Sequence, residues 1–219
     1  MILSLIDMRL IDIHTHSLPD APGTAVYCLP QGVTGIQDNQ LYSAGIHPWN
    51  TADDVSTQLE WLERIAQDRQ VAAIGESGVD RLRGAGTDAQ IELFVRQALL
   101  ADRLQKPLII HSVRSSDIML KIRRELCPSV PWAIHGFRGG VPQARQLLDS
   151  GFMLSFGIRF NPDTLRFAGL ERALFETDNH SNIHDVIANA AKVLNVVPDV
   201  VADSAAKNAR SFLEPLLAR

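Results

Sequence analysis

The chain has 219 residues, of which 46% are hydrophobic and 21% charged, which is typical of one globular domain with a sizeable core. Its formal net charge of −4 excludes a general electrostatic attraction to nucleic acid, so a phosphate-bearing substrate would have to be held by local positive charge. No apolar run reaches the ~18 residues of a membrane-spanning helix, and Cys28 and Cys127 give neither a disulfide framework nor a CxxC motif, so we expect a cytoplasmic protein without a membrane span.

Short apolar runs alternate with longer amphipathic segments along the chain. The apolar runs, which end in polar residues, predict strands at 9–14, 24–28, 41–46, 71–76, 107–111, 131–135, 151–156 and 172–178. The amphipathic segments predict helices at 52–68, 87–104, 115–126, 142–149, 183–194 and 199–213. Thr51 is the expected N-cap of the first of these helices.

This alternation of eight strands with helices predicts an α/β fold, a TIM-type (β/α)8 barrel, with a doubly wound open sheet as the alternative. No repeat, low-complexity segment or Gly/Ser-rich linker divides the chain, so residues 1–219 are expected to form a single domain. Between His16 and His47 the sequence has three prolines and no helical pattern. We therefore expect the first βα units to be abbreviated and the barrel to be distorted.

Histidines and carboxylates stand at the ends of five predicted strands. His14 and His16 close the first strand, and their side chains share one face because residues i and i+2 of a strand point the same way. In a barrel the carboxyl ends of all strands meet at one rim, where active sites lie. The residues that end the other four strands are Glu76, His111, His135 and Asp178. The six side chains are therefore predicted to face one another.

Four histidines and two carboxylates are a suitable ligand set for two divalent cations. Zn²⁺, Mn²⁺ and Co²⁺ suit imidazole ligands better than Mg²⁺ does. Two such ions ~3.5–4 Å apart activate a water molecule and stabilise the leaving oxygen of a displacement, which is hydrolytic chemistry. The sequence contains no GxSxG elbow, Walker loop or GxGxxG fingerprint, so other common catalytic machineries have no support.

Seven segments carry a family resemblance. IDIHTH, AGIHPWN, AIGESGVD, LIIHS, AIHGF, FETD and KNARSFL, in this order, resemble the TatD family of metal-dependent deoxyribonucleases, a branch of the amidohydrolase-like barrels. The resemblance covers nearly the whole chain. It implies that His47 contacts the substrate and that Asp178 takes a proton from the attacking water. It also implies two metal ions bridged by Glu76, the first held by His14, His16, Glu76 and Asp178 and the second by Glu76, His111 and His135.

The sequence departs from the family pattern at four places. Ser17 replaces the usual leucine, Arg81 and Leu82 replace an aromatic pair, and Arg114 lies one residue later than the arginine of the usual HxR. The loop after the FETD segment is shortened to residues 179–185. His180 and His184 lie in that loop, where they either line the site or are simply exposed. The differences concern the fit of a substrate, because the expected metal ligands are unchanged.

Arginines near the strand ends favour a deoxyribonuclease, because guanidinium groups grip phosphate with paired hydrogen bonds. The same metal cage also suits a small-molecule amidohydrolase, lactonase or phosphoesterase. A non-catalytic metal-binding protein is disfavoured, since every expected ligand and the base are present. We therefore expect a monomeric metal-dependent hydrolase that acts on DNA or a small phosphoester. All but one of the five arginines that follow strand ends are predicted to bind substrate, and Arg83 is the exception. The five are Arg81, Arg83, Arg114, Arg138 and Arg159.

Overall fold

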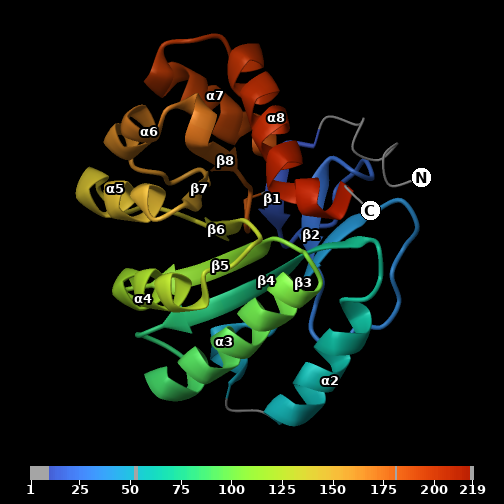
Figure 1. Cartoon of the computed structure of the whole chain (residues 1–219). Helices are drawn as coiled ribbons and strands as arrows, with labels where there is room; N and C mark the ends of the chain where they lie inside the picture. The colour runs from blue at the N-terminus through green and yellow to red at the C-terminus, as the bar shows by residue number, and fades with distance from the viewer. Residues whose placement is uncertain (1–9, 52–53, 181, 218–219) are drawn as a thin grey trace.

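The computed structural model describes residues 10–51, 54–180 and 182–217. Within them, eight parallel strands pair in chain order, and β1 also pairs with β8, so the sheet closes into a barrel (Figure 1). This closure confirms the (β/α)8 barrel and excludes the doubly wound alternative. The strands are β1 (Asp12–Thr15), β2 (Ala25–Cys28), β3 (Leu41–Ala44), β4 (Val71–Asp80), β5 (Leu108–Val113), β6 (Trp132–Ile134), β7 (Phe152–Phe156) and β8 (Ala173–Phe175).

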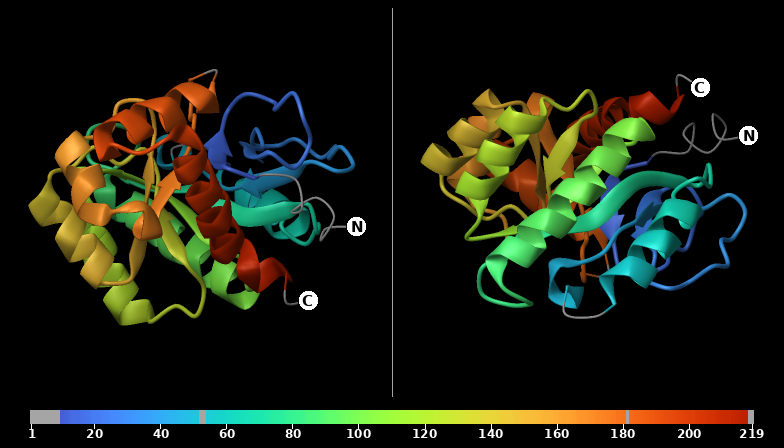
Figure 2. Two further views of the ribbon diagram at one scale, coloured as in Figure 1. Left: turned by 90° about the horizontal axis from the view of Figure 1, so that it is seen from above. Right: turned by 60° about the horizontal axis from the view of Figure 1, so that its bottom comes forward.

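Helices cover the outside of the strands (Figure 2). Within the described part of the chain, none of them has the length and apolar character that spanning a membrane requires. The α-helices are α2 (Val55–Ile65), α3 (Thr87–Arg103), α4 (Ser116–Leu126), α5 (Val141–Asp149), α6 (Pro162–Ala168), α7 (Ile183–Leu194) and α8 (Pro198–Leu217), and the 3₁₀ helices are η1 (Pro48–Asn50) and η2 (Leu170–Arg172).

The last helix, α8, closes one end of the barrel. It contacts both β4 and β8, which lie on opposite sides of the ring of strands. The side-chain amide of Asn208 donates a 2.8 Å hydrogen bond to the carbonyl of Ala173, the first residue of β8. α8 therefore crosses the amino-terminal end of the strands, and it lies in front of the barrel in Figure 1. The carboxyl ends of the strands lie on the opposite side.

The first three strands follow one another without a helix between them in the described residues. The pairing of β1 with β2 is irregular between Asp12 and Thr15, and the first helical turn of the barrel, η1, comes only after β3. These features confirm the abbreviated and distorted start of the barrel. Residue 9 of the first predicted strand and residues 52–53 of the first predicted helix lie outside the described residues.

Strand β4 is longer than its sequence pattern predicts. The prediction that it ends at Glu76 is wrong, because the strand continues to Asp80 and all ten of its residues are buried. Gly78 lies beside His111 of β5, so close that a Cβ at Gly78 would collide with the carbonyl oxygen of His111. Glycine lets the two backbones approach at this position. Glu76 therefore lies inside a strand and not at its end.

One predicted helix begins later than expected, and one helix was not predicted. The helix expected from residue 52 begins at Val55, and its N-cap is Asp54, whose carboxylate accepts hydrogen bonds from the N–H groups of Ser56 and Thr57. The hydroxyl of Thr51, the predicted cap, instead donates to the carbonyl of Pro48. Helix α6 was not predicted. Its signal in the sequence is Asn161, which caps the helix, followed by a proline at the first helical position.

Alternation along the strands directs the site residues into the barrel. On β6, Trp132 and Ile134 belong to the large cluster between the strands and the helices, whereas Ala133 packs in the smaller cluster that includes Phe212 of α8. Since α8 crosses the barrel end, Ala133 points inward. His135 lies two residues further on the same face and therefore also points inward.

Candidate metal centre

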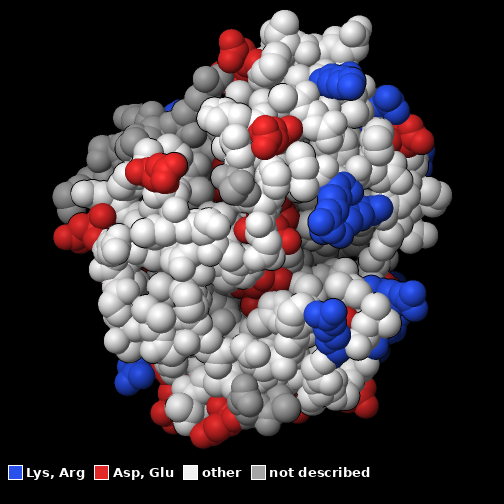
Figure 3. All heavy atoms as spheres, turned by 180° about the vertical axis from the view of Figure 1, so that it is seen from behind, with Lys and Arg blue, Asp and Glu red and all other residues white. Residues whose placement is uncertain are grey.

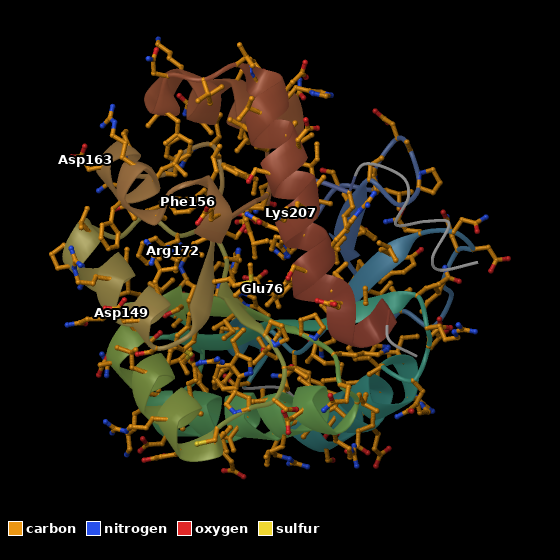
Figure 4. The ribbon with its side chains drawn as sticks, turned by 45° about the horizontal axis from the view of Figure 1, so that its top comes forward. Glu76, Asp149, Phe156, Asp163, Arg172 and Lys207 are labelled. Atoms are coloured by element: carbon orange, nitrogen blue, oxygen red, sulfur yellow. The ribbon has the colours of Figure 1, made fainter. Side chains whose placement is uncertain are left out.

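The structure brings the six predicted ligands together at the carboxyl end of the barrel. Figure 4 shows Glu76 near the centre of the ring of strands. Figure 3, viewed from the side opposite to α8, shows a hollow in which Asp and Glu atoms are visible, with Lys and Arg side chains beside it. The convergence expected from the strand ends is therefore observed, although His14, Glu76 and His111 lie within strands and not at their last residues. Their role as metal ligands remains a prediction.

One oxygen of the Glu76 carboxylate faces a first group of histidines. Oε2 lies 3.4 Å from Nε2 of His14 and 3.3 Å from Nε2 of His16. Oδ1 of Asp178 lies 3.9 Å and 3.6 Å from the same two nitrogens. This first group therefore places two imidazole nitrogens and two carboxylate oxygens around one point.

The other oxygen of Glu76 faces a second group. Oε1 lies 2.7 Å from Nδ1 of His111 and 2.7 Å from Nε2 of His135. Nε2 of His47 is 3.1 Å from the same oxygen. Glu76 is 5% exposed and stands between the two groups, which is the position of a bridging ligand.

His47 and His111 differ in which ring nitrogen carries the proton. Nδ1 of His47 accepts a hydrogen bond from the backbone N–H of Trp49, so a neutral His47 carries its proton on Nε2 and acts there as a donor. Nε2 of His111 instead faces Oδ2 of Asp80 at 3.3 Å, which leaves Nδ1 free of a proton in the neutral ring. A metal ligand needs such an unprotonated nitrogen. His111 therefore suits a metal, and His47 suits a hydrogen-bond donor.

A second carboxylate orients His135. Nδ1 of His135 lies 3.3 Å from Oε1 of Glu176, which also accepts a 2.7 Å hydrogen bond from the backbone N–H of Gly136. Carboxylates that hold the far nitrogen of a ligand histidine fix its ring and raise its basicity. This role of Asp80 and Glu176 was not predicted from the sequence, although the two residues lie inside the motifs AIGESGVD and FETD.

The imidazoles and carboxylates of this site need a positive charge among them. This need tests whether the residues fit a bound cation. His14 is fully buried, and neither of its ring nitrogens has a hydrogen-bond partner. Hydrogen bonds to Cys28 and to Glu76 raise the pKa of His16 to about 10. Burial disfavours the charge of His135, but the negative charges of Glu76 and Glu176 and the hydrogen bonds to both carboxylates together outweigh it and raise the pKa of His135 well above its ordinary value. Protons thus supply the positive charge in the metal-free chain, and a divalent cation would replace them.

The backbone places Asp178 beside the first group. Its N–H donates to the carbonyl of His14 at 3.0 Å, and its carbonyl accepts from the N–H of His16 at 2.9 Å. Asp178 has a φ of 53°, a left-handed conformation that few non-glycine residues adopt. The side-chain amide of Asn179 donates to Oδ1 of Asp178 at 2.9 Å. These bonds hold the carboxylate at the rim, where it is 27% exposed.

Two cavities flank Asp178. The larger, of about 510 Å³, is lined by every metal-ligand candidate except the buried His14, together with His47 and Trp49. The smaller, of about 260 Å³, is lined by Arg138 and Arg159. Asp178 borders both cavities, so the smaller one is an extension of the site in which the two arginines lie near the carboxylates of Glu176 and Asp178.

The remaining predicted arginines lie elsewhere. Arg81 forms two hydrogen bonds, of 2.8 Å and 2.7 Å, with the carboxylate of Asp117, and a third with the carbonyl of Arg114. The side chain of Arg114 lines neither of the two cavities. Arg83 lies over the indole of Trp49, with its guanidinium carbon 4.7 Å from the ring centroid. Of the four arginines that were predicted to bind substrate, only Arg138 and Arg159 therefore border the site directly.

The two histidines of the short loop differ. His180 lines the smaller cavity, and its Nε2 lies 3.2 Å from the carboxylate of Asp185. His184 is exposed in the first turn of α7 and lines neither cavity. The alternative that these residues line the site therefore holds for His180 only.

Sequence comparisons identify relatives of this chain. A family model described as TatD related DNase matches residues 31–214. The chain is 32% identical over 162 residues to the uncharacterized metal-dependent hydrolase YcfH of Escherichia coli K12, an alignment that covers 70% of this chain and 60% of YcfH. It is 28% identical over 193 residues to an uncharacterized metal-dependent hydrolase of Buchnera aphidicola, covering 78% of this chain and 72% of the relative. The chain thus spans about 60% of the length of YcfH.

Solved structures share the fold. The crystal structure of YjjV, a TatD homologue from Escherichia coli K12, superposes with a TM-score of 0.77 at 20% identity, covering 93% of this chain and 97% of YjjV. A TatD family hydrolase from Entamoeba histolytica gives a TM-score of 0.70 at 16% identity and covers 80% of this chain and 74% of its own. At these identities the likeness establishes the barrel fold alone.

Proposed function

Because this chain belongs to the TatD-related DNase family, we propose that it is a divalent-metal-dependent hydrolase that cleaves phosphodiester bonds of DNA. The observation that carries the proposal is the position of Glu76, whose two carboxylate oxygens face two separate groups of imidazole nitrogens at 2.7–3.4 Å. A single carboxylate shared in this way is what a two-ion hydrolytic site needs.

Each group would hold one cation. His14, His16 and Asp178 would form the first site, His111 and His135 the second, and Glu76 would contribute one oxygen to each. When bound, the two cations activate a water molecule and neutralise negative charge on the phosphate oxygens. The imidazoles favour Zn²⁺, Mn²⁺ or Co²⁺ over Mg²⁺ at these positions.

The chain's own residues then move the proton and hold the substrate. The carboxylate of Asp178 would take a proton from the water as the water oxygen bonds to phosphorus. The P–O bond to the leaving oxygen would break, and the proton would pass from Asp178 to that oxygen. Nε2–H of His47 would donate to a phosphate oxygen, as its tautomer allows. Arg138 and Arg159 would hold the adjoining phosphate in the smaller cavity, because guanidinium groups bind phosphate oxygens in pairs.

A comparison of substrates tests this function. The protein is loaded with Zn²⁺, Mn²⁺ or Co²⁺ and assayed with a single-stranded oligodeoxynucleotide, with small phosphoesters and with a panel of lactones. We expect the oligonucleotide to be cleaved by the metal-loaded protein and not by Glu76→Gln. Cleavage of lactones or of small phosphoesters with an intact oligonucleotide would replace the nuclease by a small-molecule hydrolase. Cleavage of the oligonucleotide by Glu76→Gln at the wild-type rate would contradict the bridging role of Glu76 on which the proposal rests.

A further inference from the structure

Trp49 stands out on the wall of the larger cavity. The sequence has three tryptophans, and Trp61 and Trp132 are 5% and 0% exposed, whereas Trp49 is 43% exposed. It lies in η1, directly after His47 and Pro48, and borders the cavity that contains the metal-ligand candidates. A large aromatic ring left exposed inside a pocket is an unused contact surface.

The indole is fixed in place although it is exposed. Its Nε1–H donates a 2.7 Å hydrogen bond to Oδ2 of Asp80, a carboxylate that is 3% exposed. The same oxygen lies 3.3 Å from Nε2 of His111. The indole centroid is 5.8 Å from the ring of His111 and 4.6 Å from that of His47. The ring is therefore positioned by the carboxylate that also orients a metal-ligand candidate, so little conformational freedom is lost when it binds a ligand.

The surroundings of Trp49 combine apolar surface with one positive charge. Tyr27, Leu29 and Pro30 line the same cavity. The guanidinium of Arg83 lies over the indole, 4.7 Å from the ring centroid, so a cation covers one face of the ring and the other face is left for a ligand. Among the described residues Arg83 forms no ion pair, in contrast to Arg81, which is bound to Asp117. Apolar walls with a cation beside them suit a flat ring attached to a phosphate.

We propose that Trp49 is a base-binding subsite, against which a purine or pyrimidine base of the substrate packs while the adjoining phosphate lies at the metal centre. This inference rests on the proposed phosphodiester hydrolysis, because that reaction places a phosphate next to the wall. Contact between a base and an aromatic side chain tolerates every base, since each has a flat π surface. The subsite therefore selects nucleotides over other phosphoesters without selecting a base sequence.

Two ligands that differ only in the base test the subsite. Deoxyadenosine monophosphate and deoxyribose phosphate share the sugar and the phosphate, and their dissociation constants are measured by calorimetry on the Zn²⁺-loaded protein. We expect the nucleotide to bind about 5- to 100-fold more tightly. The ratio should fall close to one in Trp49→Ala and be largely kept in Trp49→Phe. Leu82→Ala, an exposed apolar residue that does not line the cavity, is the matched control and should keep the wild-type ratio.

Tryptophan fluorescence gives a second readout that does not depend on activity. Because the other two tryptophans are buried, a ligand that packs against Trp49 quenches the accessible part of the emission. Deoxyadenosine monophosphate should quench it, and deoxyribose phosphate should not. Equal affinities for the two ligands, absence of nucleotide binding, or a nucleotide preference that survives in Trp49→Ala would each overturn the subsite.

The outcomes separate this inference from the proposed function. If the oligonucleotide is not cleaved but the nucleotide preference depends on Trp49, the subsite stands and the proposed reaction falls. If the oligonucleotide is cleaved but both ligands bind alike, the reaction stands and the subsite falls.

Discussion

The hydroxyl of Thr177 donates a 2.7 Å hydrogen bond to Oδ2 of Asp12, and the backbone N–H of Thr177 donates to Oδ1 at 3.1 Å. Asp12 belongs to the first strand of the barrel, and Thr177 follows the last. The N–H of His14 donates to the same carboxylate at 3.2 Å. One buried side chain thus joins β1 to the end of β8, between the metal-ligand candidates His14 and Asp178.

This contact predicts a pH dependence of stability. Burial raises the pKa of Asp12 to about 7 from its ordinary 3.8, although the hydrogen bonds from Thr177 and His14 lower it. The folded chain then keeps a proton on Asp12 that the unfolded chain releases. The stabilisation that this proton gives to the folded state is lost as the pH rises from about 4 to about 7. In metal-free protein, wild type should lose about 1 kcal/mol per pH unit relative to Asp12→Asn. Urea denaturation at several pH values measures the difference, and a constant difference would contradict the prediction.

Glu76→Gln is expected to abolish hydrolysis while the fold is kept. An amide is nearly isosteric with the carboxylate but carries no negative charge to share between two cations. Metal content should fall from the wild-type value, and circular dichroism should be unchanged. Glu60→Gln, an exposed carboxylate on α2, is the matched control and should behave as wild type. Full metal occupancy with near-normal turnover in Glu76→Gln would refute the bridging role.

Asp178→Asn should lower kcat much more than it raises KM. The proton that Asp178 accepts moves only in the transition state, so its loss costs about a hundredfold or more in rate. Steady-state kinetics on a defined oligonucleotide, with metal content measured in parallel, checks this outcome. A defect confined to KM would show that Asp178 positions the substrate and is not the base.

Chelation should stop activity without unfolding the protein. The core is formed by the apolar faces of strands and helices, and the cations add only the free energy of their own binding. For one site this is about 2.7 kcal/mol at a hundredfold excess over the dissociation constant. The melting temperature should therefore fall by a few degrees, while the helical circular dichroism at room temperature stays the same. Loss of that signal with chelator would show that the metals are structural.

Arg138 and Arg159 should carry the salt dependence of DNA binding. Each phosphate contact contributes a slope of about −0.7 for single strands, because counterions are released when the contact forms. Replacing both arginines by alanine should weaken binding, flatten the slope by about one to two units and leave metal content unchanged. A double variant of the exposed Arg96 and Arg210 to alanine removes the same charge away from the two cavities and should keep the slope. Equal slopes in wild type and both variants would show that the cavity arginines do not contact phosphate.

The sequence by itself determined the class of fold and the set of candidate ligands. Strand and helix periodicities are local signals, so the sequence locates the eight strands and most helices. The prolines after His16 likewise predicted the missing helices at the start of the barrel. Because parallel strands in a barrel share one direction, residues near their carboxyl ends had to converge, and His14, Glu76 and His111 did so.

The tertiary structure alone decided which role each of these side chains has in the site. Asp80 reaches both Trp49 and His111, and Arg81 is neutralised by Asp117, a residue 36 positions further along the chain. No local pattern encodes such contacts, since they depend on how loops from different strands pack against one another. The same holds for the direction of the two Glu76 oxygens, which face imidazoles that lie in or directly after four other strands. Periodicity predicts which face a residue lies on, but only packing determines which atom it meets.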